Sequence, residues 1–425
     1  MGSKRVPEVR FKGFSEGWEN LTLNSMVKRV KSYSLSRDVE TSKNTGFQYI
    51  HYGDIHKKVA NIIDLKSNLP NIQPGNYELL KTGDLILADA SEDYQGIATP
   101  AIVYEDLPYK LVAGLHTIAL RPESKRVDSL FLYYLINSQV FRKHGYRVGS
   151  GMKVFGISAT NILKFEYVYP TIVEQTQIGN FFKQLDETIA FQQQELDILK
   201  QTKQGFLQKM FPKEGEFLPQ IRFSGFSGEW EERNFFDNIN SIFDFRGRTP
   251  KKLGLDWSKS GYLALSALNV KNGYIDLNVD AYYGDEELYK KWMGDKILKQ
   301  GQVLFTTEAP MGNVAQVPDN KGYILSQRTI AFEVDDAKIT NDFLSILLRS
   351  PTVINQLYSM SSGGTAKGVS QKSLSKLKIV VPKSLEEQTQ IASFFKQLDE
   401  TIALHEQELN ILKQTKKAFL QKMFV

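Results

Sequence analysis

The segment EQTQIGNFFKQLDETIAFQQQELDILKQTKQGFLQKMF, residues 174–211, returns later in the chain as EQTQIASFFKQLDETIALHEQELNILKQTKKAFLQKMF, residues 387–424. Of the 38 aligned positions 30 are identical, at an offset of 213 residues, and chance does not produce such a match. This offset is half of the 425-residue chain and far exceeds the period of a solenoid repeat. The sequence therefore predicts that one unit, a variable domain followed by a helix, is present twice.

Apolar residues recur within each copy at alternating steps of three and four, which is typical of a coiled-coil helix. Neither copy contains proline, and each begins just after one, as a helix start requires. A single helix with one apolar seam is marginal in water, so we expect the two copies to pair antiparallel. The residues predicted to make this pairing are Phe182, Leu185, Ile189, Leu196, Leu199 and Phe206 in the first copy and Phe395, Leu398, Ile402, Leu409, Leu412 and Phe419 in the second. Polar residues interrupt both seams, Gln192 and His405 at one position and Lys203 and Lys416 at another, and should help to fix the register.

The regions between the helices, residues 20–170 and 232–382, share a pattern but little identity. Short β-branched and aromatic runs predict strands, and two longer stretches predict helices. The strands are expected at 47–52, 84–87 and 111–120 and at 261–265, 302–306 and 324–334, and the helices near 128–145 and 341–358. The predicted fold class is α/β (α+β): two mixed α/β domains separated by a long antiparallel two-helix coiled coil, in a pseudo-twofold internal repeat.

Composition narrows the class of protein. The chain has no cysteine, which argues against a disulfide scaffold, a zinc finger or a thiol nucleophile and fits a reducing compartment. It has no apolar run of membrane-spanning length and no apolar signal-peptide core near Met1, so we expect a soluble cytoplasmic protein with no membrane partner. The net charge of +5 permits a polyanionic partner without demanding one.

Motifs for catalysis are missing. The sequence contains no phosphate-binding G-x-x-x-x-G-K-[ST] loop, no G-x-G-x-x-G after a strand and no H-E-x-x-H. It also lacks the N-P-P-[YF] and D-P-P-[YF] tetrapeptides of amino-methyltransferases, and five histidines offer little for a metal site. We therefore expect a chain that is not an enzyme, has no catalytic or metal-binding residues and binds no cofactor.

Positive charge gathers outside the repeated helices. Residues 171–210 and 383–425 carry net charges of −1 and 0, against +6 on the remaining 342 residues. The basic residues form clusters, several of them beside glycines that would let backbone N–H groups approach a phosphate. The predicted DNA contacts among them are Arg142, Arg147 and Lys153 in the first half and Arg246, Arg248, Lys251, Lys367 and Lys372 in the second. For any one cluster the alternative is an ordinary solvated surface.

His116 and Arg328 occupy equivalent positions in otherwise similar runs, HTIA at 116–119 and RTIA at 328–331. Two domains that read different DNA sequences with one fold should keep the surrounding residues and differ in the polar residue that contacts the bases. Arginine can read guanine in the major groove, and the preceding Gln327 can read adenine. We therefore expect His116, Gln327 and Arg328 to contact DNA, the alternative being an ordinary exposed pair.

The junctions PTIVEQTQI at 170–178 and PKSLEEQTQI at 382–391, followed by LDETI at 185–189 and 398–402, resemble the DNA specificity (S) subunit of type I restriction-modification systems. The resemblance covers the whole chain. It implies that residues 1–171 and 215–384 are target-recognition domains, and that residues 172–214 and 385–425 are conserved helices. Because recognition domains vary within this family, base-reading residues do not carry over.

The resemblance also implies partners. The chain would bind double-stranded DNA at a bipartite, asymmetric site and dock two methyltransferase (modification) subunits and restriction/translocase subunits. S-adenosylmethionine, ATP and Mg would belong to those subunits. Two alternatives remain open from the residues alone: a self-contained DNA methyltransferase or nuclease with degenerate motifs, and an interaction scaffold with no role on DNA.

Overall fold

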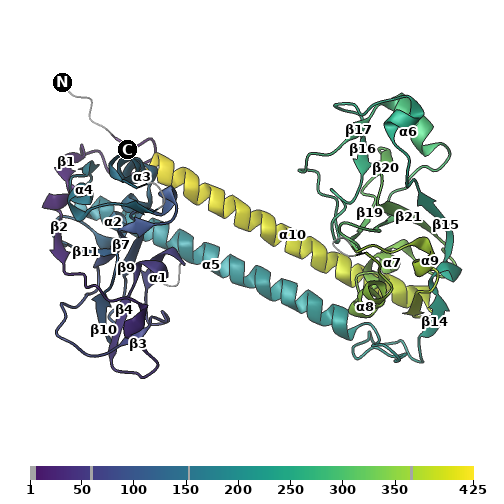
Figure 1. Cartoon of the computed structure of the whole chain (residues 1–425), viewed down its shortest axis with the longest axis horizontal. Coiled ribbons are helices and arrows are strands. Elements are labelled where there is room, and N and C mark those ends of the chain that lie inside the picture. Colours follow the sequence, from purple (N-terminus) through teal and green to yellow (C-terminus); the bar gives the residue numbers. More distant parts are fainter. Residues whose placement is uncertain (1–5, 58–60, 152–153, 364–366) are drawn as a thin grey trace. The chain divides into compact units, whose positions relative to one another are not determined.

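The computed structural model describes residues 6–57, 61–151, 154–363 and 367–425 (Figure 1). The chain forms two units: unit 1 comprises the residues up to Gln193 together with Gln407–Val425, and unit 2 comprises Gln194–Glu406. Each unit contains one variable domain and parts of two long helices, α5 (Ile172–Lys209) and α10 (Leu385–Lys422). Both helices cover the repeated segment, as the heptads predict.

The variable domain of unit 1 is built on two main sheets, ordered β2-β11-β7-β9-β5 and β10-β4-β6-β3. The strands of the first sheet are β2 (Val27–Val30), β11 (Thr117–Pro122), β7 (Leu85–Ala88), β9 (Pro100–Val103) and β5 (Ile62–Ile63). Those of the second are β10 (Lys110–Ala113), β4 (Phe47–Ile50), β6 (Asn71–Ile72) and β3 (Glu40–Thr41), and the short pairs are β1 (Glu19–Thr22) with β13 (Glu166–Tyr169) and β8 (Ala90–Ser91) with β12 (Phe155–Gly156). The helices are α1 (Tyr52–His56), α2 (Ser129–Asn137), α3 (Gln139–Val148) and α4 (Ala159–Leu163), with 3-10 turns η1 (Leu23–Ser25), η2 (Arg37–Val39) and η3 (Tyr94–Gly96).

Unit 2 repeats this plan with sheets ordered β15-β21-β18-β19 and β17-β16-β20. The strands are β15 (Ile239–Asp244), β21 (Thr329–Val334), β18 (Val303–Thr306), β19 (Val314–Gln316), β17 (Tyr283–Gly284), β16 (Tyr262–Leu265) and β20 (Tyr323–Leu325), and β14 (Glu231–Asn234) pairs with β22 (Lys378–Val381). The helices are α6 (Glu286–Met293), α7 (Asn341–Leu347), α8 (Pro351–Ser359) and α9 (Gln371–Leu374), with turns η4 (Phe235–Asn238) and η5 (Pro250–Leu253). The strands β2, β11, β7 and β9 thus correspond in order to β15, β21, β18 and β19, which confirms one fold in two copies.

Two predicted strands are wrong in the same way. The apolar runs 111–120 and 324–334 were each expected as one strand, yet each is two strands that belong to different sheets. The break falls at His116 and Arg328, whose φ angles of 55° and 66° lie in the left-handed region. A strand cannot continue through that conformation, so the chain turns there from one sheet into the next.

The predicted helices near 128–145 and 341–358 are each two helices. Ser138 has extended backbone (φ −70°, ψ 157°) and separates α2 from α3. Ser350 has the same conformation (φ −67°, ψ 145°) because the next residue, Pro351, disfavours helical geometry before it.

The two long helices run antiparallel in each unit. In unit 1 the ring centroids of Phe181 on α5 and Phe419 on α10 lie 5.1 Å apart, and Lys416 pairs with Asp186. In unit 2 the repeat-equivalent contacts join Phe206 to Phe394, with centroids 4.9 Å apart, and Lys203 to Asp399. As the residue number rises along α5, the residue number of its contact on α10 falls. This confirms the predicted antiparallel pair.

The segment before each variable domain is tied to the helices by matching contacts. Arg10 Nε donates to Glu174 at 2.6 Å, and Arg222 Nε donates to Glu387 at 2.6 Å. Both carboxylates are almost fully buried, with side-chain exposures of 0% and 2%. The backbone of Val9 donates to the carbonyl of Lys422 at 3.2 Å. In unit 1 the N-terminal segment therefore follows the end of α10 in space.

Candidate nucleic-acid interface

The two residues singled out by the repeat occupy matching corners. His116 and Arg328 each sit at the turn between two sheets, and each accepts a hydrogen bond at its carbonyl, from Asp89 N at 3.1 Å and Thr307 N at 2.8 Å. Each side chain also meets a carboxylate. His116 Nδ1 lies 3.0 Å from Asp89 Oδ1, and Arg328 Nε lies 2.8 Å from Glu308 Oε1.

Both corners are strained. A left-handed φ costs a residue with a Cβ of the order of 1 kcal/mol or more, and such strain persists where the surroundings enforce it. His116 and Arg328 remain exposed, at 48% and 55% of their side-chain areas. The fold thus holds two polar side chains toward solvent at equivalent places, an imidazole at one and a guanidinium at the other.

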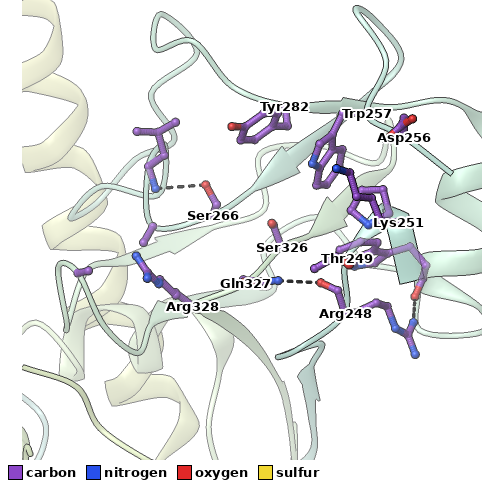
Figure 2. Close-up of a pocket in the computed structure, with 15 residues that line it drawn as sticks. Arg248, Thr249, Lys251, Asp256, Trp257, Ser266, Tyr282, Ser326, Gln327 and Arg328 are labelled. Atoms are coloured by element: carbon purple, nitrogen blue, oxygen red, sulfur yellow. Dashed lines mark hydrogen bonds between the residues drawn. The ribbon is translucent and has the colours of Figure 1, made fainter. Parts of the chain in front are cut away.

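Four predicted DNA contacts lie together in unit 2. Arg248, Lys251, Gln327 and Arg328 line one concavity of about 540 Å³ (Figure 2). Gln327 Nε2 donates to the carbonyl of Arg248 at 2.8 Å, which ties the β20–β21 turn to the loop after β15. The Arg248 guanidinium donates to the carbonyl of Trp292 and lies 4.8 Å from the ring centroid of Phe245. Arg248 therefore shapes the concavity as well as charging it.

Two further predicted contacts lie beside the end of β15. Arg246 pairs with Asp244 at 2.7 Å, and the neighbour of Lys372, Gln371, donates to the same carboxylate at 2.8 Å. Burial opposes ionisation of Asp244, but the hydrogen bonds from Arg246 and Gln371 outweigh it and hold the pKa below its ordinary value. Lys372 is exposed on α9. The carboxylate thus fixes Arg246 and the start of α9 with respect to each other.

The basic cluster of unit 1 lies on α3. The Arg142 guanidinium lies 5.5 Å from the ring centroid of Tyr146, whose ring stacks on Tyr94 with centroids 5.0 Å apart. Arg147 is exposed and its Nη2 lies 3.4 Å from His144 Nδ1. Lys153 lies outside the described residues.

Unit 2 repeats this association of a cation with an aromatic ring. Lys367 Nζ lies 5.7 Å from the centroid of Tyr358, the repeat equivalent of Tyr146. Gly368, next to Lys367, forms a bridge with Glu308, the partner of Arg328. Lys367 is therefore linked through one short backbone segment to the strained corner.

All twelve residues predicted to pair the long helices are buried or half-buried. Contacts with the variable domains add to this pairing. Asp399 accepts hydrogen bonds from Lys203 of α5 and from Arg349 of the variable domain, the latter at 3.1 Å. Its equivalent Asp186 accepts hydrogen bonds from Lys416 of α10 and from the hydroxyl of Tyr134, the latter at 2.8 Å. One acidic residue per unit thus joins both helices to a variable domain.

The sequence did not predict that two aromatic residues, Trp257 and Tyr282, line the concavity. Trp257 and Tyr282 stack with centroids 5.3 Å apart and planes inclined by 23°. They lie on the side facing Gln327 and Arg328 (Figure 2). The only signal in the sequence was a tryptophan, Trp257, followed by several tyrosines up to Tyr283. The acidic partners Asp89 and Glu308 were also missed, because their pairing depends on the turn.

The model of the type I restriction modification DNA specificity domain matches residues 15–201 and 228–414, one match in each half of the chain. The chain belongs to this family. Each specificity domain match therefore includes one variable domain and most of the long helix that follows it. The sequence resemblance to the S subunit is confirmed.

Two curated relatives are specificity subunits of type I restriction enzymes. The chain is 22% identical to the MjaX type I restriction enzyme specificity subunit of Methanocaldococcus jannaschii over 346 residues, covering 80% of this chain and 76% of that protein. It is 25% identical to the MjaVIII type I restriction enzyme specificity subunit of the same organism over 312 residues, covering 71% of each.

Solved structures have the same fold. The S subunit of a type I restriction-modification system from M. genitalium matches with a TM-score of 0.61 and 13% identity, covering 99% of both chains. A chain from a structure of type I R-M complex assembly and conformational transition matches with a TM-score of 0.53 and 15% identity, covering 96% of this chain and 97% of that one. Neither the family model nor these relatives support a self-contained methyltransferase or nuclease.

Neither a metal-binding cluster nor a membrane-spanning helix is found among the described residues. Within residues 6–57, 61–151, 154–363 and 367–425, no group of three or more His, Asp or Glu side chains is placed to hold a metal ion. Across the same ranges, no helix combines the length and apolar character that crossing a bilayer requires.

Proposed function

We propose that the chain is the sequence-specific DNA-binding subunit of a type I restriction-modification complex and that it reads a bipartite, asymmetric site. The concavity of unit 2 carries this proposal, because it gathers Arg248, Lys251, Gln327 and Arg328 at a strained corner. The equivalent corner of unit 1 presents His116 instead. Since the frame is shared and the polar side chains differ, the two halves of the DNA site should differ.

The division of labour follows the repeat. Residues 1–171 and 215–384 would be the target-recognition domains, and residues 172–214 and 385–425 the helices that hold them. The chain would carry out no chemistry of its own. Methyl transfer with S-adenosylmethionine and translocation with ATP and Mg would reside in partner subunits, and the complex would work in the cytoplasm, where the chromosome lies.

An exposed apolar pair on the helices of each unit supports docking of a methyltransferase subunit. In unit 1 Phe191 and Ile411 are 57% and 51% exposed, and in unit 2 their equivalents Leu404 and Ile198 are 54% and 52% exposed. A coiled-coil helix usually carries polar residues on its outer face. Since the same two positions are apolar in both copies, two equivalent docking sites are expected, one for each of two methyltransferase subunits.

The recognition proposal is tested by enrichment. The complex of this chain with its methyltransferase subunits is used to select duplexes from a random library, and the bound fraction is sequenced. We expect one interrupted motif with two different halves, and Arg328→Ala should relax one half while leaving the other intact. A motif with identical halves, or a change in both halves on Arg328→Ala, would contradict the assignment.

The docking proposal is tested by stoichiometry. Phe191→Asp with Ile411→Asp places two charges in one apolar pair, and native mass spectrometry should show one methyltransferase subunit per chain in place of two. Gln201→Asp, an exposed position of α5, serves as the control and should leave two. If the double variant still carries two subunits, docking does not use this face.

A further inference from the structure

The concavity of unit 2 has the form of a binding pocket for a small planar group. Its volume of about 540 Å³ is within the range of ligand pockets, and its lining combines aromatic and apolar side chains with polar and charged ones. It is formed by the loop 248–257, the start of the segment after β16, and the β20–β21 turn. Figure 2 shows the aromatic side chains on one side and Gln327 and Arg328 on the opposite side.

The aromatic side is a rigid platform. Trp292 is 1% exposed, and its Nε1 donates to the carbonyl of Leu325 at 2.9 Å, which anchors the ring. Trp257 packs on Trp292 with centroids 5.5 Å apart and stacks on Tyr282. Tyr282 is nonetheless 59% exposed. An exposed aromatic residue held by an anchored stack offers a flat apolar surface to a second ring.

The polar side supplies hydrogen-bonding groups at the rim. Gln327 is fixed by its bond to Arg248, and Arg328 is fixed by Glu308 and by its strained backbone. Ser326 is 8% exposed, and Asp256 adds an acceptor beside Trp257. Donors and acceptors placed around a planar apolar surface match the edge of a nucleobase.

Unit 1 fills the corresponding space. The pairing of β4 with β10 and of β16 with β20 makes Ile50 equivalent to Leu265, so Tyr52 corresponds to Ala267. Ala267 lines the pocket beside Arg328. Tyr52 instead packs against His116, with ring centroids 5.2 Å apart. The same fold therefore has an aromatic side chain in this corner in unit 1 and an open pocket in unit 2.

We propose that the pocket of unit 2 receives a nucleobase that has left the stack of the bound duplex, with Tyr282 and Trp257 as its stacking platform. This inference rests on the proposed DNA-binding function. Base edges inside an intact duplex lie recessed between two phosphate backbones and are read by convex elements such as helices and ribbons, whereas a concavity takes a group that projects from the DNA. An extruded base is such a group, and aromatic stacking accepts any base while the rim residues select among them.

The test is a scan of the bound target for unstacked bases. Duplexes carry 2-aminopurine at single purine positions, thymines are probed with permanganate, and the complex with its methyltransferase subunits is added. We expect one reactive position in the half-site that Arg328→Ala relaxes, in addition to any signal at the methylated adenines, and none equivalent in the other half-site.

Variants assign that position to the pocket. Tyr282→Ala should abolish its signal and weaken binding about 10-fold. Tyr282→Phe keeps the ring and should keep the signal. Tyr274→Ala removes a tyrosine of matching exposure, 58%, that does not line this pocket, and should change nothing.

The outcomes separate the two proposals. If the complex binds no specific sequence, the proposed function fails. If it binds its sequence but the only unstacked bases are the methylated adenines, or the extra signal survives Tyr282→Ala, the pocket does not hold a base and this inference alone is overturned.

Discussion

His116 and Arg328 show how one residue can combine a structural and a functional role. Each occupies the left-handed turn that moves the chain from one sheet to the other, where glycine would be the unstrained choice. Each presents a polar side chain to solvent instead. Replacement by glycine would relieve the strain and remove the side chain. The requirement of the fold for a left-handed residue therefore does not by itself explain a histidine or an arginine here.

Lys367 should act on affinity rather than on sequence preference. Lysine contacts phosphate as a point charge, and loss of one phosphate contact lowers the slope of log affinity against log salt by about one unit. Lys367→Ala should therefore weaken binding to all sequences, as measured in a salt titration. Lys383→Ala, an exposed lysine two residues before α10, is the control. An altered sequence preference would assign Lys367 to base reading instead.

At the scale of elements, the long helices and the variable domains are joined through Asp186 and Asp399. Burial, and then the neighbouring Asp186 carboxylate, raise the pKa of Tyr134, so its hydroxyl remains a hydrogen-bond donor to Asp186. In unit 2 the equivalent partner of Asp399 is the charged Arg349, whose side chain is only 6% exposed. The two units therefore use a neutral and a charged donor for one task.

This difference predicts unequal costs. Asp399→Asn leaves the buried Arg349 guanidinium without its countercharge and should lower the free energy of unfolding by about 3 kcal/mol. Asp186→Asn keeps an acceptor for the neutral Tyr134 and should cost about 1 kcal/mol. Urea unfolding followed by tryptophan fluorescence suits unit 2, which holds Trp230, Trp257 and Trp292. Equal effects of the two substitutions would show that Arg349 is not the reason.

At the scale of the whole molecule, the repeat places a DNA-reading domain at the head of each of two nearly identical helices. Each helix has 38 residues, and each contributes to both units. Helix length is therefore the feature of the chain best suited to set the spacing between the two halves of the DNA site.

Removing one matched heptad from each helix tests this role. Deleting residues 192–198 and 405–411 shortens each helix by roughly 10 Å at 1.5 Å per residue, about three base pairs of B-DNA. The half-site sequences should persist while the spacer between them shortens or binding is lost, as read from the enriched motif. Replacing 192–198 with the sequence of 405–411 keeps the length and should leave the spacer unchanged. A spacer unaffected by the deletions would show that helix length does not set the distance between the two half-sites.

The sequence by itself determined what repeats: two copies of one domain, two heptad helices that pair antiparallel, the S subunit resemblance, and the equivalence of His116 with Arg328. These follow from periodicity and from comparison of the chain with itself, which are local or register-based signals. Only the tertiary structure decided that the runs 111–120 and 324–334 break at those residues, because nothing in an apolar run announces a left-handed turn. It alone brought Trp257 and Tyr282 to face Gln327 and Arg328, since their proximity depends on strands that pair across many residues of sequence.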